Sequence, residues 1–248
     1  MPASRPLSRT AAVAVAALLT AGVLGGCSVA GTDFNPGTAA TVGEETIRSS
    51  EVDRLTVAAC DAYGPQLAAD NQVLPLRLIK TTVAQNLVLG SAVRQLGEEY
   101  DVSTGEVYEG GVATALAAYT DLGEGEQEAV ELVGATNALV SDVLGQIGAQ
   151  LAGTDAPTDP ADPAAQEAVA LGGEELTAWL ERNDIELDPQ YGISVTDTGS
   201  QATDTALSFP VSDAARAGAA ETEPDPATTM ALPETQRCGS FSAVGGAG

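Results

Sequence analysis

The sequence contains no histidine and few aromatic residues. The absence of histidine excludes histidine-dependent catalytic triads and histidine-ligated metal centres. Aromatic residues make up only 4% of the chain, and Trp179 is the single tryptophan. A hydrophobic core must therefore be built from alanine, valine and leucine, a composition that favours close-packed helices over a β-sandwich.

Basic residues are also scarce. Lysine and arginine together number 10, against 35 aspartate and glutamate residues, and the formal net charge is −25. Nucleic acids and anionic lipid headgroups bind to positively charged surfaces, so this composition argues against both as partners. It is compatible with solubility and with cationic or unfolded polypeptide partners.

The N-terminal segment has the pattern of an export signal. Arg5 and Arg9 precede an apolar run at residues 11–23, and the tetrapeptide LGGC then ends at Cys27. This arrangement resembles a bacterial lipobox, which implies that Cys27 receives a lipid containing acyl chains such as palmitate and becomes the new N-terminus. A transmembrane anchor is the weaker alternative, because the apolar run is shorter than the ~20 residues that span a bilayer.

We therefore expect residues 1–26 to be a lipoprotein signal peptide. The mature chain is then anchored to the outer face of the cell membrane, outside the cytoplasm. Thiols oxidise in such a compartment, so the remaining cysteines, Cys60 and Cys238, are expected to form a disulfide bond. Two separate free thiols are the alternative. A bond would hold the C-terminal tail on the first helix.

Apolar periodicity predicts a mainly helical domain with a little β-structure. After a flexible tether at 27–38, the pattern predicts extended segments at 39–42 and 46–47, then helices at 50–64, 75–100, 103–119, 124–151 and 162–183. Ser50 with Asp53, and Ser103 with Glu106, have the spacing of capping boxes. The 124–151 helix has the clearest apolar stripe, at Val130, Val133, Leu139 or Val140, Val143, Leu144, Ile147 and Leu151.

The last third of the chain is less regular. Residues 152–163 predict a linker rich in proline, aspartate and glycine, and Gly172-Gly173 are expected to break or bend the helix that follows. A short strand is expected at 185–187. Residues 193–248 predict an irregular acidic tail, in which only Val195 and residues 207–209 favour short extended pieces.

Both ends of residues 39–192 resemble one family. The segment 40–52 is similar to the start of the SurA/PrsA-like chaperone and foldase domain, with matches at Val42, Gly43, Ile47, Glu51 and Val52. The segment 185–192 is similar to the closing strand of that domain. The resemblance implies a mainly α, SurA-like helical domain over 39–192, whose short N-terminal β-hairpin pairs with a C-terminal strand.

The chain lacks one part that members of this family usually have. SurA- and PrsA-like proteins usually carry a parvulin prolyl-isomerase domain, and here only the linker 152–163 stands at the corresponding place. The histidines that parvulin sites generally use are absent. We therefore expect no isomerase activity, no other enzymatic activity, no cofactor and no metal. Paired acids such as Glu98-Glu99 are interpreted as solvated helix ends.

The expected function is chaperone-like binding of unfolded or extended polypeptides, without chemistry, by a lipoprotein anchored through Cys27. The alternative is a structural or scaffolding lipoprotein that binds one specific folded envelope partner. Tyr63, Trp179 and Tyr191 are candidates to line a peptide groove, or else to form the core of an aromatic-poor domain.

Overall fold

The computed structural model describes residues 36–196, 199–202 and 226–240, so the signal segment, Cys27 and residues 207–209 lie outside the described residues. The described residues from Gly37 onward belong to one compact unit. Its helices are α1 (Ser49–Ala69), α2 (Leu76–Glu99), α3 (Glu106–Ala117), α4 (Glu124–Ala152), α5 (Pro163–Arg182) and α7 (Pro226–Met230). The described chain is mainly helical, as predicted.

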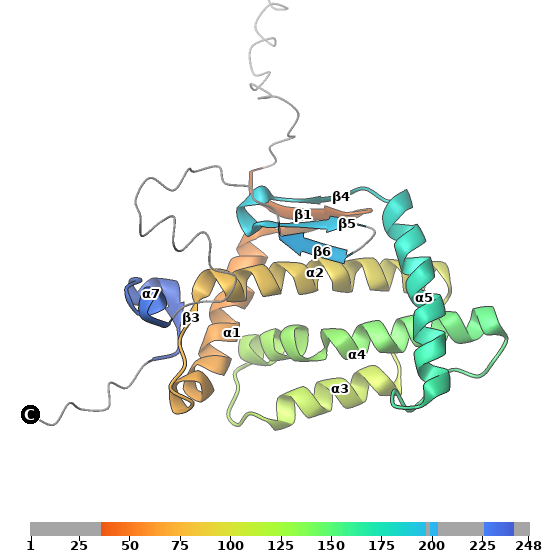
Figure 1. Cartoon of the computed structure of the whole chain (residues 1–248), viewed down its shortest axis with the longest axis horizontal. Helices are drawn as coiled ribbons and strands as arrows, with labels where there is room; N and C mark the ends of the chain where they lie inside the picture. Colours follow the sequence, from red (N-terminus) through yellow and green to blue (C-terminus); the bar gives the residue numbers. More distant parts are fainter. Residues whose placement is uncertain (1–35, 197–198, 203–225, 241–248) are drawn as a thin grey trace, which may run out of the picture. The chain divides into compact units, whose positions relative to one another are not determined.

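A small antiparallel sheet joins the two ends of the predicted domain. Its strands are β1 (Thr38–Val42), β2 (Glu45–Arg48) and β4 (Ile185–Leu187), in the order β2-β1-β4. Val42 pairs with Ile185 and Ala40 with Leu187, so β4 lies beside β1 as Figure 1 shows. The predicted pairing of the N-terminal hairpin with a C-terminal strand is therefore confirmed.

Helix α1 differs from its prediction at both ends. It begins at Ser49 with no side-chain cap, so the predicted Ser50 capping box is wrong; the Ser49 N–H instead donates to the Gly37 carbonyl at 2.9 Å. The helix also continues past Pro65 to Ala69. A proline removes one helical hydrogen bond, but Leu67 packs against the hydrophobic core, and this tertiary contact favours an extra turn.

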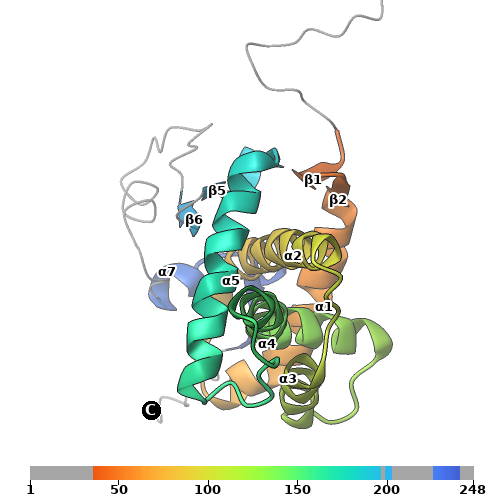
Figure 2. The ribbon, with the colours of Figure 1, turned by 90° about the vertical axis from the view of Figure 1, so that its right-hand side faces the viewer.

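Helix α4 lies at the centre of the helical layer. It contacts α1, α2, α3 and α5, and Figure 2 shows it nearly end-on among these helices. Most of its predicted stripe is buried, including Val130, Val143 and Ile147. The prediction for Leu151 is wrong, because this side chain is 50% exposed in the last turn.

Helices α4 and α5 cross at very short range. A Cβ atom at Gly148 would overlap the Ala168 carbonyl, and one at Gly172 would overlap the Leu144 carbonyl. Gly172 therefore lets two backbones touch within a continuous helix, and the predicted break or bend at Gly172-Gly173 is wrong. The predicted start of α5 is confirmed, since the Asp162 side chain accepts a hydrogen bond from the Ala164 N–H at 2.9 Å.

A distant aspartate supplies the N-terminal cap of α3. The predicted Ser103 capping box is wrong, because the N-cap residue is Gly105, which has no side chain to cap the helix. Asp142 of α4, only 4% exposed, instead accepts hydrogen bonds from the backbone N–H groups of Gly105 and Tyr108. This carboxylate joins α3 to the core helix.

The C-terminal region contains more structure than the irregular tail predicted for 193–248. Strands β5 (Ile193–Thr196) and β6 (Gly199–Ala202) form a hairpin. The 3₁₀ turn η1 (Pro189–Tyr191) precedes this hairpin, and the 3₁₀ turn η2 (Glu234–Gln236) lies between α7 and the last strand. After α7, strand β7 (Arg237–Cys238) pairs with β3 (Leu74–Pro75).

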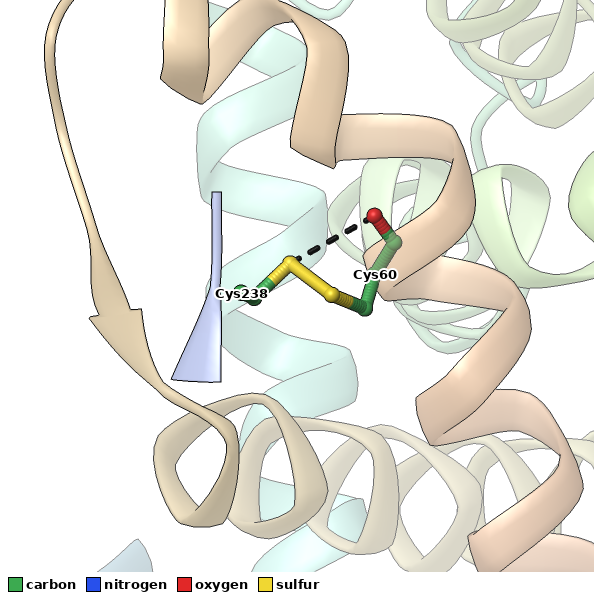
Figure 3. Close-up of a disulfide and its surroundings, with 2 residues drawn as sticks. All are labelled: Cys60 and Cys238. Carbon is green, nitrogen blue, oxygen red and sulfur yellow. Dashed lines mark hydrogen bonds between the residues drawn. A yellow bond between two sulfur atoms is a disulfide. The ribbon is translucent and has the colours of Figure 1, made fainter. Parts of the chain in front are cut away.

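Cys60 of α1 and Cys238 of β7 lie at disulfide-bonding distance, as predicted, with their Cα atoms 5.5 Å apart (Figure 3). Cys238 is buried against the hydrophobic core. Gly239, with φ +83°, follows at a point where a Cβ atom would lie 2.6 Å from the Gln72 carbonyl oxygen. A long-range covalent bond and a strand pair thus hold this segment in place.

Candidate functional site

A groove of about 780 Å³ lies between α3 and α4. Most of its lining is apolar or small. The residues from α3 and its C-terminal end are Glu106, Val107, Gly110, Gly111, Thr114, Ala115, Ala118 and Tyr119, and those from α4 are Val130, Gly134, Asn137, Ala138 and Ser141. Tyr63 of α1 closes one end.

The groove exists because α3 is an apolar helix that the core does not cover. No residue of α3 is fully buried. Gly111 allows α3 to approach Ala138 so closely that an added Cβ would overlap that side chain, and a Cβ at Gly134 would lie 2.8 Å from that of Ala115. The helices thus touch through their smallest residues, and these residues are too short to fill the space beside the contact.

Two tyrosines form the end of the groove near the start of α4. The rings of Tyr63 and Tyr119 meet edge-to-face, with their centroids 5.5 Å apart. Burial raises the pKa of Tyr63 to about 12 and also raises the pKa of Tyr119. Both hydroxyls therefore stay protonated at neutral pH, and this end presents uncharged aromatic surface.

The opposite end of the groove lies beside the linker between α4 and α5. Thr158 and Pro160 of this linker contribute to the lining. A smaller adjoining cavity of about 180 Å³ lies between Val107, Ser141 and the linker prolines. The segment predicted as a linker therefore forms a wall of the groove.

The three candidate aromatic residues have different positions. Tyr63 lines the groove, whereas Trp179 and Tyr191 belong to the buried core. The Trp179 Nε1–H donates to Glu99 at 2.8 Å, which anchors α5 to the end of α2. Tyr191 lies beneath the Lys80 ammonium, whose Nζ is 5.7 Å from the ring centroid. The structure therefore brings none of these three residues together in one site.

Sequence reasoning missed most of the groove. Gly110-Gly111 and Gly134 gave the only signal, since small residues on two amphipathic helices indicate a close approach. That signal does not specify which helices meet.

The face that carries the groove is strongly acidic. Residues 95–181, which include α3, α4 and most of α5, contain 18 acidic residues and no lysine or arginine. Arg54 of α1 pairs with Glu128 at 2.6 Å, and this hydrogen-bonded contact lowers the pKa of Glu128. Glu106 and Glu109 of α3 have no basic partner among the described residues. The groove is thus an apolar surface in a negative electrostatic field.

The described part of the chain contains no group of three or more potential metal-ligating side chains. None of the helices described is both long and apolar enough to cross a bilayer. In comparisons with known proteins, the chain matches no protein-family model, no curated protein and no solved structure.

Proposed function

We propose that the protein is a membrane-anchored extracytoplasmic lipoprotein that binds unfolded or extended polypeptide segments reversibly, as a chaperone does and without isomerase activity. The observation that carries this proposal is the groove between α3 and α4. It is apolar, has uncharged tyrosines at one end, and measures about 780 Å³, within the size range of ligand pockets.

The surroundings of the groove suit reversible binding of apolar segments. An amphipathic segment gains free energy when its apolar side chains leave water, at about 25 cal/mol per Å² of buried surface. Small residues on both walls impose little side-chain specificity, which favours clients of varied sequence. The excess of acidic residues keeps the protein soluble while a client is bound.

Anchoring through Cys27 completes the proposal. The segment between Cys27 and β1 would let the domain move close to the membrane surface, where exported polypeptides emerge unfolded. Lipid attachment would restrict binding to clients on that side of the membrane.

The test uses the full chain in nanodiscs of zwitterionic phosphatidylcholine and several unrelated, permanently unfolded polypeptides. Gly110→Leu fills the groove from a position where an added Cβ meets no atom within 4 Å. Gly173→Leu in α5 is the matched control, because a Cβ there is equally unhindered and the residue lies outside the groove. We expect Gly110→Leu to weaken binding of every client at least roughly tenfold, about 1.4 kcal/mol, and Gly173→Leu to leave binding unchanged.

The outcomes separate the alternatives. Failure of the wild-type protein to bind any unfolded polypeptide would contradict the proposal. Equal binding by wild type and Gly110→Leu would show that the groove is not the binding site. Selective capture of one folded envelope protein would instead favour a scaffolding role. Circular dichroism and urea unfolding of both variants confirm that each is folded before binding is measured.

A further inference from the structure

We propose that the preferred occupant of the α3–α4 groove is a cationic amphipathic polypeptide segment, with its apolar side chains in the groove and its lysine or arginine side chains at the acidic rim. This inference rests on the proposed function and names the substrate class of the same groove. It follows from the combination of an apolar lining with two helices, α3 and α4, that contain acidic residues and no basic residue.

One exposed carboxylate lines the groove, and two others lie on the same helix or just beyond its end. Glu106 lines it directly, and Glu109 lies one turn further along α3 with its side chain exposed. Asp121 follows Tyr119 by two residues at the other end and is also exposed. Among the described residues, none of these three carboxylates forms an ion pair with a basic side chain. Neither α3 nor the loop after it supplies a basic residue to offset these charges.

Two acidic residues of α4 near the groove do have hydrogen-bond partners. The Glu128 carboxylate is bonded to Arg54, and Glu131 accepts a hydrogen bond from the Tyr108 hydroxyl at 2.6 Å. Arg94 and Arg182 bound the stretch that lacks basic residues, and neither lines the groove. A bound segment must therefore supply the positive charge itself.

This arrangement discriminates between ligands by charge. An anionic segment would meet like charge along the groove, whereas a cationic segment would meet opposite charge on the same apolar surface. The same field disfavours anionic membrane lipids and nucleic acids as occupants. Because the rim carboxylates are exposed, the preference should weaken as salt shortens the Debye length from about 10 Å at 0.1 M to about 3 Å at 1 M.

The experiment measures binding of three synthetic peptides to the full chain in phosphatidylcholine nanodiscs. The peptides share one pattern of apolar residues, and their polar positions are all lysine, all glutamine or all glutamate. We expect affinity in the order lysine, glutamine, glutamate, with a difference of about tenfold between the first two at low salt. That difference should fall to about twofold or less in 1 M salt.

Two sets of variants locate the effect. Glu106→Gln with Glu109→Gln removes one charge that lines the groove and a second exposed charge on α3. Glu44→Gln with Glu186→Gln removes two exposed charges at the three-stranded sheet. The first pair should reduce the preference for the lysine peptide over the glutamine peptide at least threefold. The second pair should leave it unchanged. Gly110→Leu should weaken binding of the lysine and glutamine peptides alike.

The results distinguish this inference from the proposed function. Equal affinity for all three peptides, with loss of binding in Gly110→Leu, overturns the charge preference and keeps the groove as a polypeptide site. Absence of binding by any peptide contradicts the proposed function itself. Lysine-peptide binding that survives Gly110→Leu would show attraction to the acidic surface outside the groove, and would also overturn the inference.

Discussion

The buried carboxylate of Asp142 in α4 accepts a hydrogen bond from the Gly105 N–H, at the first residue before α3. Its second N–H partner is Tyr108, and Gln146 donates to it at 2.9 Å. A single side chain therefore accepts hydrogen bonds from two backbone N–H groups at the start of a helix that has no side-chain cap of its own. Because α3 forms one wall of the groove, Asp142 also fixes that wall.

Removal of this cap should destabilise the protein. Asp142→Ala leaves two backbone N–H groups without their acceptor in a part-buried place, so we expect a loss of about 2–3 kcal/mol in the free energy of unfolding. Asp142→Asn keeps one acceptor oxygen and should lose about 1 kcal/mol. Urea unfolding measures both values, and hydrogen exchange at residues 105–109 should accelerate in Asp142→Ala. Equal stability of the two variants would contradict the capping role.

The crossing of α4 and α5 predicts strong sensitivity at one glycine. Gly148→Ala places a methyl group against the Ala168 carbonyl, where there is no space, and should cost about 3 kcal/mol. The control is Gly173→Ala, whose methyl group meets no atom within 4 Å and should raise stability by up to about 1 kcal/mol. Thermal and urea unfolding should therefore give shifts of opposite sign for the same chemical change.

Loss of the Cys60–Cys238 bond should release the C-terminal segment. Cys60→Ala with Cys238→Ala removes a constraint between positions separated by 178 residues, and we expect a loss of about 2–4 kcal/mol, model-dependent in its origin. Limited proteolysis should then cut near residues 226–240 while the helices from α2 to α5 stay protected. Reductant should reproduce the effect in the wild type and have none in the double variant. Unchanged protection after reduction would show that packing alone holds the segment.

Alkaline pH should destabilise the fold. Burial raises the pKa of Tyr63 and of Tyr108 to about 12 in the folded protein, against an ordinary value of 10. The unfolded chain then loses its phenolic protons first, so the contribution of these tyrosines to stability is constant below pH 10 and falls as the pH rises from about 10 to about 12. Ultraviolet absorbance of the phenolate follows the titration, and urea midpoints follow the stability. Tyr63→Phe should make the decline shallower; an unchanged slope would argue against this cause.

Substitution of Cys27 tests the proposed anchor. Cys27→Ala should abolish lipid attachment and normal processing at that residue, and the protein should move from the detergent phase to the aqueous phase on partitioning. Mass spectrometry of the wild-type N-terminus should show an acylated Cys27. An unmodified cysteine in the wild-type membrane fraction would refute the proposal, whereas Cys27→Ala should leave peptide binding by the domain unchanged.

The sequence predicted the features that depend on local patterns, or on the segments 40–52 and 185–192 that resemble one family. The partnership of residues 40–42 with 185–187 and the Asp162 cap of α5 belong to this group. Helix α1 extends beyond its predicted end because Leu67 packs on the core, a contact that Gly64-Pro65 do not reveal. The cap of α3 was missed because its acceptor, Asp142, lies in another helix.

The groove and the C-terminal elements depend on distances between remote residues. Apolar periodicity indicates which face of α3 and α4 is buried, but not that Gly111 meets Ala138 and leaves a hollow beside them. Strand β7 is only two residues long, and its stability comes from β3 and the link to Cys60 rather than from its own sequence. The approach of α3 to α4 and the contact of β7 with β3 both join residues far apart in the sequence, and no short sequence pattern indicates either one.

The position of β4 in the three-stranded sheet has a consequence for biosynthesis. In the export that we propose, β1 would cross the membrane early, and one of its edges would stay open until Ile185–Leu187 had followed the helices from α1 to α5. An unpaired edge of this kind is prone to pair with other chains. Under this proposal the newly exported protein would itself need, until β4 pairs with β1, the kind of protection that we propose it gives to other chains.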